Sequence, residues 1–515
     1  MKRRSLLPVL ALLACSHVPA PVAPATAAPP TVIEGVPAGL GEVPAMPREA
    51  RGVWIATVGN MDWPSRPGLP ADSQRAELRR IFDHVQRLRM NLVILQVRPS
   101  GDALYPSALE PWSAYLTGEM GRAPEPYYDP LAFAIEEAHA RGLELHAWFN
   151  PYRARHPSAR GEASPLHISR AKPQLVRKYG THWWMDPGEP EVQEHSLRVI
   201  LDVVRRYDID GVHIDDYFYP YREYSDGQLI DFPDEPSWTR YVNFGGKLER
   251  ADWRRQNVDV FVQRLHEAVR TAKPHVKFGI SPFGIWRPGF PESVRGLDAY
   301  VELYADSRKW LNNGWLDYFA PQLYWQVSAP QQGYEELLSW WSNENRYGRH
   351  IWPGNAAFRV RRDQQNWPPE EIAQQIMLTR SHEGATGNIH FNMTSLMRNQ
   401  GGVTDVIANH AYTHDALMPT TTWLDNVPPP APKIRVIDHA VEITAAEGEQ
   451  PLVYAVRLKM ADGWHAVTIP ADRTRFPLAR APGMMPEVVV VTAVDRNGNE
   501  SAAVKVSLSA LLFRS

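Results

Sequence analysis

The alternation of short apolar runs with longer helical stretches is the feature that most restricts how this 515-residue chain can fold. Between residues 47 and 425, runs rich in β-branched, aromatic and aliphatic residues alternate with segments that carry apolar residues at three- and four-residue steps. The expected strands are 51–57, 91–99, 143–152, 210–218, 277–286, 317–325, 350–358 and 387–396. The expected helices are 72–89, 128–141, 189–206, 253–272, 298–312, 331–346 and 368–382. This pattern predicts an α/β fold, a TIM-like (β/α)8 barrel of parallel strands.

An open doubly wound sheet is the alternative, but it normally has a glycine-rich phosphate turn after its first strand, which RGVWIATVGNMDWP lacks. After the proline run that begins at Pro428, the pattern becomes all-β. Residues 426–515 therefore predict a small sandwich like a fibronectin type III domain.

The N-terminus predicts export and anchoring. Residues 1–15, MKRRSLLPVLALLAC, join a basic start to a short apolar run and resemble a lipoprotein signal peptide whose lipobox ends at Cys15. An ordinary secretory signal is the alternative. The Pro/Ala-rich residues 16–46 predict an extended tether. Because no run approaches ~20 apolar residues, we expect lipidation of Cys15 and a membrane anchor. Ser16 favours the outer membrane, facing the periplasm.

Composition excludes several classes of partner and site. The 55 Lys and Arg against 58 Asp and Glu leave a net charge of −3, so nucleic acid is not an expected partner. A single Cys excludes an internal disulfide framework and a Cys-based zinc site. The 18 Trp and 20 Tyr can fill a core or stack on sugar faces.

The C-terminal strand ends hold the candidate site, because chemistry in such barrels lies there. The expected substrate-binding residues are Trp54, Arg98, Trp148, Asn150, His213, Tyr217, Gln322, Tyr324, Trp325, His390 and Asn392. Amides, carboxylates and aromatic rings together are typical of a carbohydrate site.

Asp215, in YDIDGVHIDDY, is the leading catalytic candidate, since an ionised carboxylate can stabilise an oxocarbenium-like carbon. A salt-bridged structural role is its alternative. Asp216 fits either direct catalysis or a supporting role. A second, protonated carboxyl is needed, and Asp102 and Asp306 are the candidates, with Glu302 beside Asp306. Either of the last two can also be a solvated helix residue, and Asp102 can pair with Arg98.

Two further patterns each allow two interpretations. His410 and His414 have the i, i+4 spacing of paired metal ligands, but they follow the acidic pair by about 195 residues. A capped helix end explains them better, and we expect neither a metal nor a cofactor. The Trp183–Trp184 pair fits a sugar platform and loop packing equally.

From about residue 47 to 425, the chain resembles glycosyl hydrolase-like family ten, which contains the DigH-type bacterial lipoproteins. The motifs are RGVWIATVGNMDWP, QVRPSGDALYPS, AWFNPYR, YDIDGVHIDDYFYP, ISPFGIWR, APQLYW and GNIHF. The resemblance implies a cell-envelope glycosidase that hydrolyses glycosidic bonds of peptidoglycan strands, in particular peptide-stripped strands. It identifies no cell-division partner. A non-catalytic wall-binding lipoprotein and a metal-dependent polysaccharide deacetylase remain alternatives.

Overall fold

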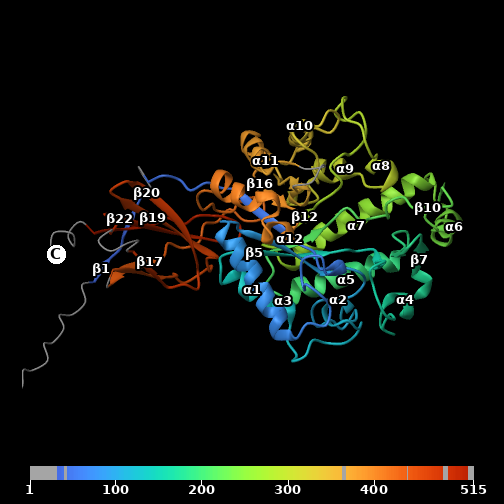
Figure 1. The fold of residues 1–515 in the computed structure, drawn as a ribbon, viewed down its shortest axis with the longest axis horizontal. Helices are drawn as coiled ribbons and strands as arrows, with labels where there is room; N and C mark the ends of the chain where they lie inside the picture. The colour runs from blue at the N-terminus through green and yellow to red at the C-terminus, as the bar shows by residue number, and fades with distance from the viewer. Residues whose placement is uncertain (1–31, 40–42, 362–366, 438, 479–484, 509–515) are drawn as a thin grey trace, which may run out of the picture.

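A computed structural model describes residues 32–39, 43–361, 367–437, 439–478 and 485–508. It shows an α/β part and, at one end of it, an all-β part (Figure 1). The predicted signal peptide 1–15, Cys15 and most of the predicted tether lie outside the described residues. No described helix is long and apolar enough to cross a membrane.

The α/β part is built on one parallel sheet, as predicted. Its strands are β3 (Ala50–Ile55), β4 (Leu92–Arg98), β5 (Glu144–Phe149), β9 (Gly211–Ile214), β12 (Lys277–Ile280), β13 (Tyr318–Phe319), β14 (His350–Ile351), β15 (Gly354–Asn355) and β16 (Gly387–His390). They pair in the order β14-β13-β12-β9-β5-β4-β3-β16-β15. Only Trp352 and Pro353 separate β14 from β15, so one continuous chain segment joins the two ends of the sheet. The curled sheet thus closes on itself, as in a (β/α)8 barrel.

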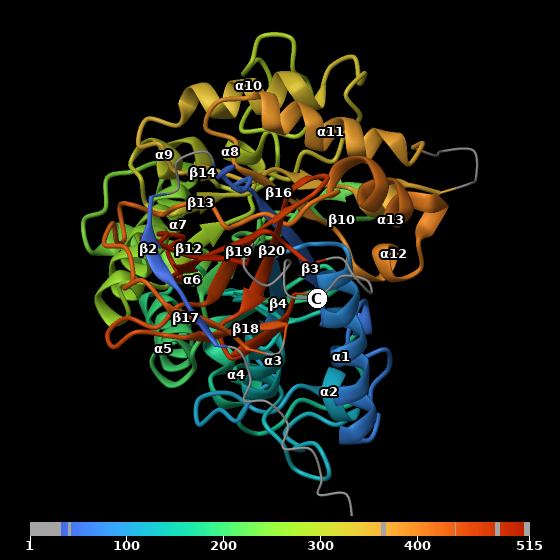
Figure 2. The same ribbon diagram turned by 90° about the vertical axis from the view of Figure 1, so that its left-hand side faces the viewer.

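The main helices surround the sheet (Figures 1 and 2). They are α1 (Ala71–Arg87), α3 (Pro130–His139), α5 (Pro190–Arg206), α7 (Arg250–Ala272), α10 (Tyr334–Glu344) and α11 (Glu370–Ser381). The single helix predicted over 298–312 is wrong: the segment forms α8 (Ala299–Glu302) and α9 (Ser307–Asn312). Tyr304 between them has a φ of 52°, which no right-handed helix allows, and its hydroxyl accepts a hydrogen bond from Arg254 at 2.6 Å.

Short helices and strands lie in the loops between the main elements. The helices are α2 (Ala114–Thr117), α4 (Ile168–Ala171), α6 (Glu235–Asn243), α12 (Met393–Met397) and α13 (Val403–Val406), with single turns η1 (Val58–Asn60), η2 (Pro173–Leu175), η3 (Ala357–Arg359), η4 (Gln400–Gly402) and η5 (Ile407–Ala411). The strands are β6 (Arg153–Arg155), β7 (Val176–Tyr179) and β8 (His182–Met185) in one small sheet, and the hairpin β10 (Tyr224–Ser225) and β11 (Gln228–Leu229).

The barrel strands are shorter than the apolar runs that predicted them. The run 210–218, for example, ends as a strand at Ile214, and Asp215 already lies outside the ladder. Trp54, Trp148 and Tyr318 belong to a cluster that fills the barrel interior, whereas the opposite faces of the strands pack against the helices.

The all-β part is a two-sheet sandwich. One sheet contains β1 (Ile33–Glu34), β17 (Lys433–Ile437), β18 (Ala440–Thr444) and β21 (Arg475–Pro477). The other contains β2 (Val36–Ala38), β23 (Ala503–Ser507), β22 (Val488–Val494), β19 (Val453–Met460) and β20 (Gly463–Pro470). The two sheets share one apolar core that includes Val436, Val456 and Val491. The all-β character is as expected, and the fibronectin type III likeness stays a prediction.

The predicted tether 16–46 is wrong in its second half. Ile33 pairs with Val436 in one sheet, and Val36 pairs with Lys505 in the other. Met46 is buried against the sandwich and the barrel. The edges of β17 and β23 accept these short strands, and an edge position also tolerates Pro37, which lacks a backbone donor.

The sandwich covers the N-terminal ends of the barrel strands, as Figure 2 shows from that side. Arg496 of the sandwich forms ion pairs with Asp208 and Asp210, just before β9. Its carbonyl oxygen accepts a hydrogen bond at 2.6 Å from Lys277, the first residue of β12. The C-terminal strand ends, at the opposite side of the barrel, therefore stay free of the sandwich.

We predict that Ile33 of β1 stabilises the sandwich. Ile33→Ala should lower its free energy of unfolding by about 1–2 kcal/mol, because the side chain packs on the sandwich core. Val36→Ala, at a side chain that is 56% exposed, is the matched control and should have almost no effect. Thermal unfolding followed by calorimetry checks this. Equal losses in the two variants would contradict it.

Candidate active site

A cavity of about 450 Å³ opens at the C-terminal ends of the barrel strands, a size typical of small-molecule sites. It is lined by Trp54, Ala56, Val58, Gly59, Met61, Gln96, Trp148, Arg153, His156, Asp215, Asp216, Tyr217, Ser281, Gln322, Tyr324 and Phe391. These residues come from strands or following loops of β3, β4, β5, β9, β12, β13 and β16. The predicted mouth of the barrel is therefore a real depression with two carboxylates in its wall.

Asp215 follows directly on Ile214, the last residue of β9, and is almost fully buried. Its Oδ2 accepts hydrogen bonds from Trp148 Nε1 at 3.1 Å and from Asn150 Nδ2 at 2.6 Å. Both donors come from the neighbouring strand β5 and the residues just after it. Oδ1 accepts only a long bond, 3.4 Å, from the backbone N–H of Tyr217.

A chain of amides holds Asn150 in place. Gln96 Nε2 donates to Asn150 Oδ1 at 2.6 Å, so the Asn150 amide must present its N–H group to Asp215. Gln96 Oε1 in turn accepts from the backbone N–H groups of Thr57 and Val58 at 2.9 and 2.8 Å. The loop after β3 thereby fixes a donor that points at a carboxylate after β9.

The two neighbouring carboxyls carry displaced pKa values. Burial, and then the adjacent Asp216 carboxylate, raise the pKa of Asp215 to about 7, against the lowering effect of Arg153 and Asn150. Burial also raises the pKa of Asp216, although hydrogen bonds from Tyr221 and Gln322 oppose the shift. Close like charges in a buried site cannot both ionise easily, so the pair keeps a proton near neutral pH.

Arg153 is a cationic residue of the cavity that the sequence analysis did not single out. Its side chain is buried, with Cζ 4.3 Å from the centre of the Tyr217 ring. The guanidinium donates to the Pro99 carbonyl at 3.3 Å, and within the described ranges no carboxylate forms a salt bridge with it. Arg153 lies in the motif AWFNPYR, three residues after Asn150, so the strand-end rule could have found it.

Trp54 forms part of an aromatic wall, and His213 supports it from below. Trp54 Nε1 donates to His213 Nε2 at 3.0 Å, and Tyr318 OH lies 2.9 Å from His213 Nδ1. Burial, and then His146, hold the pKa of His213 well below its usual value, so the ring is a neutral acceptor. The prediction of His213 as a substrate-binding residue is corrected accordingly, because it lies beneath the cavity wall and not in it.

The structure brings seven predicted residues together around the cavity. They are Trp54, Trp148, Asp215, Asp216, Tyr217, Gln322 and Tyr324. Asn150 does not line the cavity itself but donates a hydrogen bond to Asp215, which does. Besides Arg153, the lining residues outside the predicted set are Ala56, Val58, Gly59, Met61, Gln96, His156, Ser281 and Phe391. Burial, and then Arg153 and His182, lower the pKa of His156 to about 4, so it adds no charge at neutral pH.

Arg98 does not reach the cavity. Its guanidinium is fully buried in an ion pair with Glu110, whose carboxyl also contacts His195 at 2.8 Å. Burial alone would raise the pKa of Glu110, but Arg98 and His195 outweigh it and lower the value to about 2. Arg98 thus locks the loop after β4, and its assignment as a substrate-binding residue is wrong.

Neither predicted second carboxyl lines the cavity. Asp102 is buried in the loop after β4, where its Oδ1 accepts from the backbone N–H of Ser100 at 2.8 Å. Its expected pairing with Arg98 is replaced by the Arg98–Glu110 pair. Asp306 caps the N-terminus of α9 and accepts from Trp286 Nε1 at 3.0 Å. Their placement as catalytic residues is therefore corrected.

Glu302, weighed beside Asp306, forms an ion pair with Arg222 at 3.4 Å. Trp184 is buried and donates to the Phe218 carbonyl, whereas Trp183 is 40% exposed. Trp184 therefore packs within a loop, as one of the two interpretations of the Trp183–Trp184 pair expected.

The last three predicted binding residues also serve the fold. His390 contacts Tyr412 OH at 3.0 Å on the outer face of β16, because its neighbour Ile389 takes the inner face. Asn392 Nδ2 donates to Asp62 Oδ1 at 2.9 Å. Trp325 packs its ring against Phe283 and is absent from the cavity lining. Strand alternation and loop anchoring, respectively, explain why His390 and Asn392 do not face the substrate.

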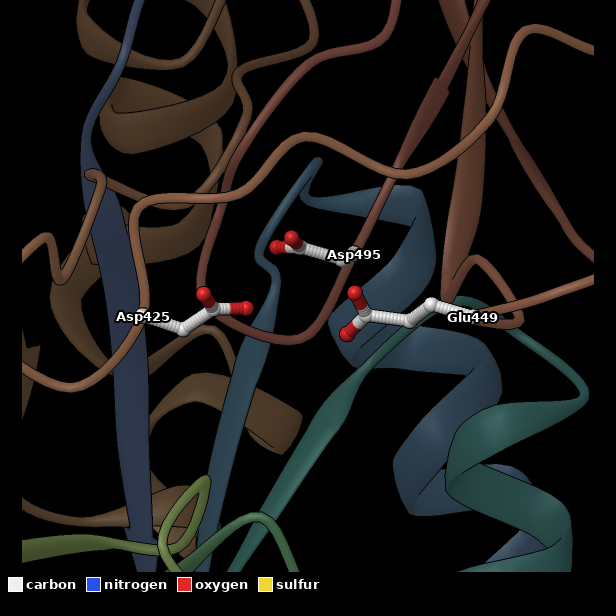
Figure 3. Close-up of side chains that lie close together, drawn as sticks. All are labelled: Asp425, Glu449 and Asp495. Atoms are coloured by element: carbon white, nitrogen blue, oxygen red, sulfur yellow. The ribbon is translucent and has the colours of Figure 1, made fainter.

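His410 and His414 are exposed and belong to no group of three metal-ligating side chains among the described residues. Such a group is formed instead by Asp425, Glu449 and Asp495, where the sandwich meets the barrel (Figure 3). Asp495 Oδ1 already accepts from the backbone N–H groups of Asn497 and Asn499. This group lies away from the cavity.

Comparisons with known proteins place the chain in a family. Residues 49–369 match the family described as glycosyl hydrolase-like 10. The chain is 43% identical over 399 residues to the glycosyl hydrolase YngK of Bacillus subtilis (strain 168), covering 75% of this chain and 76% of YngK. It is 37% identical over 367 residues to the glycosyl hydrolase DigH of Escherichia coli (strain K12), covering 67% of this chain and 80% of DigH.

Among solved structures, an α-L-fucosidase isoenzyme 2 from Paenibacillus thiaminolyticus is similar with a TM-score of 0.45 and 14% identity, over 71% of this chain and 49% of that one. That likeness is too distant to indicate an activity.

The raised pKa of Asp215 predicts a pH-dependent stability effect. Because the folded value of about 7 lies above the unfolded 3.8, this carboxyl destabilises the fold progressively as the pH rises from about 4 through 7. Asp215→Asn should therefore stabilise the protein at pH 8, by up to about 4 kcal/mol, and much less at pH 4. Denaturant unfolding at both pH values checks this. A variant that is less stable than the wild type at pH 8 would contradict the raised pKa of this buried carboxyl.

Proposed function

Because this chain belongs to the glycosyl hydrolase-like 10 family, we propose that it is a glycoside hydrolase that cleaves glycosidic bonds of peptidoglycan glycan strands. The observation that carries the proposal is the buried Asp215–Asp216 pair in the wall of an aromatic-lined cavity. A protein that only grips a glycan has no use for a carboxyl whose pKa is raised to about 7.

We assign the proton donor to Asp215. A general acid works best when its pKa lies near the working pH, and the pKa of Asp215 is about 7. Trp148 and Asn150 occupy Oδ2, which leaves Oδ1 as the oxygen that can carry a proton toward the substrate. This reverses the role expected from the sequence, in which Asp215 was the ionised residue and another acid was the donor.

Asp216 takes the complementary role. With the proton on Asp215, Asp216 is the carboxyl of the pair that holds the negative charge, and the hydrogen bond that Tyr221 donates to its Oδ2 stabilises that charge. As Asp215 protonates the leaving oxygen and the glycosidic bond breaks, positive charge develops on the anomeric carbon. An ionised Asp216 beside it stabilises that charge until a water molecule adds to the anomeric carbon and gives one proton back to Asp215, which yields the new reducing end.

The aromatic wall supports a sugar substrate. Trp54, Trp148, Tyr217, Tyr324 and Phe391 surround the two carboxyls. Flat rings stack on the apolar faces of pyranose units, and the amides between them suit hydroxyl and acetamido groups. The wall polymer, and its peptide-stripped form in particular, follows from the resemblance of the motifs to the DigH-type lipoproteins.

The activity prediction uses Asp215→Asn. Wild-type protein should release soluble fragments with new reducing ends from amidase-treated peptidoglycan sacculi, and Asp215→Asn should lower kcat/KM by about 10³-fold or more. The wild-type rate should also fall as the pH rises through about 7, because Asp215 then loses its proton. Asp306→Asn is the matched control: it changes an acid outside the cavity and should keep near-normal activity.

Binding of glycan strands without release of fragments by the wild type would favour the non-catalytic binder. Near-normal activity in a folded Asp215→Asn protein would contradict the assignment of the donor.

We also propose that the protein is a lipid-anchored envelope protein of the outer membrane. The support is the resemblance of residues 1–15 to a lipoprotein signal ending at Cys15. Cys15→Ala should move the protein from the membrane fraction to the soluble envelope fraction, with unchanged specific activity on isolated glycan. Fractionation and mass spectrometry of the mature N-terminus check this. A Cys15→Ala protein that stays in the membrane would contradict the anchor.

A further inference from the structure

A second cavity, of about 310 Å³, adjoins the first. It is lined by Gly59, Asn60, Ser65, Arg66, Pro67, Ala114, Tyr115, Gly118, Ser158 and Arg160. Gly59 lines both cavities. His156, in the wall of the first cavity, contacts Ser158 Oγ in the second at 2.7 Å. The two cavities are therefore neighbours along one face of the barrel.

The second cavity is built from the loops that follow β3, β4 and β5, on the same side of the barrel as the carboxyl pair. Hydrogen bonds hold these loops together. Tyr115 OH lies 2.9 Å from Ser158 Oγ, and Asn60 Nδ2 donates to the Tyr115 carbonyl at 2.8 Å. Gly59 has a φ of 64°, a conformation that a glycine adopts without strain at the junction of the cavities.

The charge of this second cavity is positive. Arg66 and Arg160 line it, both are exposed, and no Asp or Glu is among its lining residues. Neither arginine has a salt bridge to any residue of the described ranges.

Arg153 extends the same charge into the first cavity. Its guanidinium is buried and has no carboxylate in salt-bridge contact within the described part of the chain, although it lowers the pKa of both Asp215 and Asp216. Three arginines without a salt bridge in the described ranges therefore line the two neighbouring cavities, Arg153 the first and Arg66 and Arg160 the second. Guanidinium groups bind carboxylates through two parallel hydrogen bonds.

We propose that the second cavity is a subsite for a sugar unit that bears a free carboxylate, adjacent to the unit whose bond is cleaved, with Arg66 and Arg160 binding that carboxylate. The subsite rests on the proposed function, since it extends the same glycan beyond Asp215. Muramic acid units carry such a carboxylate on their lactyl group when no stem peptide is attached, and the stem peptide converts it to a neutral amide. The arginines would therefore act as specificity-determining residues.

The test compares two substrates and two variants. Peptide-stripped glycan strands are used as they are and after chemical reduction of their carboxylates to alcohols. The wild type should show about tenfold higher kcat/KM on the carboxylate form, as expected for exposed charge-assisted pairs. The Arg66→Ala/Arg160→Ala double variant should lose about tenfold on that form and almost nothing on the reduced form. Arg473→Ala, an exposed arginine of the sandwich, is the control and should change neither.

A binding measurement separates this subsite from the proposed hydrolysis. In the Asp215→Asn background, removal of Arg66 and Arg160 should weaken binding of the carboxylate form by about tenfold, and added salt should reduce the difference. Equal losses on both glycan forms, or no loss on the carboxylate form, would overturn the subsite. A wild type that cleaves neither form would contradict the hydrolase, while the binding result would still decide the subsite.

Discussion

The burial of two adjacent carboxyls at the end of β9 is the constraint on which the organisation of the cavity depends. An isolated buried carboxylate is costly, so its surroundings must supply hydrogen bonds, a counter-charge or a proton. Trp148 and Asn150 supply donors to Asp215, Tyr221 supplies one to Asp216, and Arg153 supplies positive charge. These groups do not fully compensate, which leaves a proton on the pair near neutral pH and makes acid catalysis chemically available.

A polar chain inside the barrel links its two ends. Lys277 pairs with Glu144 at the end that the sandwich covers, and Glu144 contacts His146 at 3.1 Å. His146 and His213 both contact Tyr318 OH at 2.9 Å, and His213 accepts from Trp54 at the cavity wall. Because each member has a partner, the interior tolerates these groups and orients the Trp54 ring. The sandwich covers one end of the barrel (Figure 1), and the cavity opens at the other.

The proposed cleavage and the proposed carboxylate subsite use different loops on the same face of the barrel. The acid pair follows β9, whereas the loops after β3, β4 and β5 shape the second cavity and carry its arginines. Arg153, in the short strand β6, lines the first cavity. Its positive charge lowers the pKa of Asp215, against the larger effect of burial.

The sequence by itself determined the strand–helix alternation, the all-β character of the C-terminal part and the position of Asp215 at a strand end, because these follow from local periodicity. It could not distinguish Arg98 from Arg153, since which arginine meets Glu110 and which faces the cavity depends on loops distant in sequence. It likewise predicted 16–46 as a tether, whereas residues 33–38 pair with strands more than 390 residues away. The raised pKa of Asp215 was decided by tertiary structure alone, because burial and the closeness of Asp216, Asn150 and Arg153 exist only in the folded barrel.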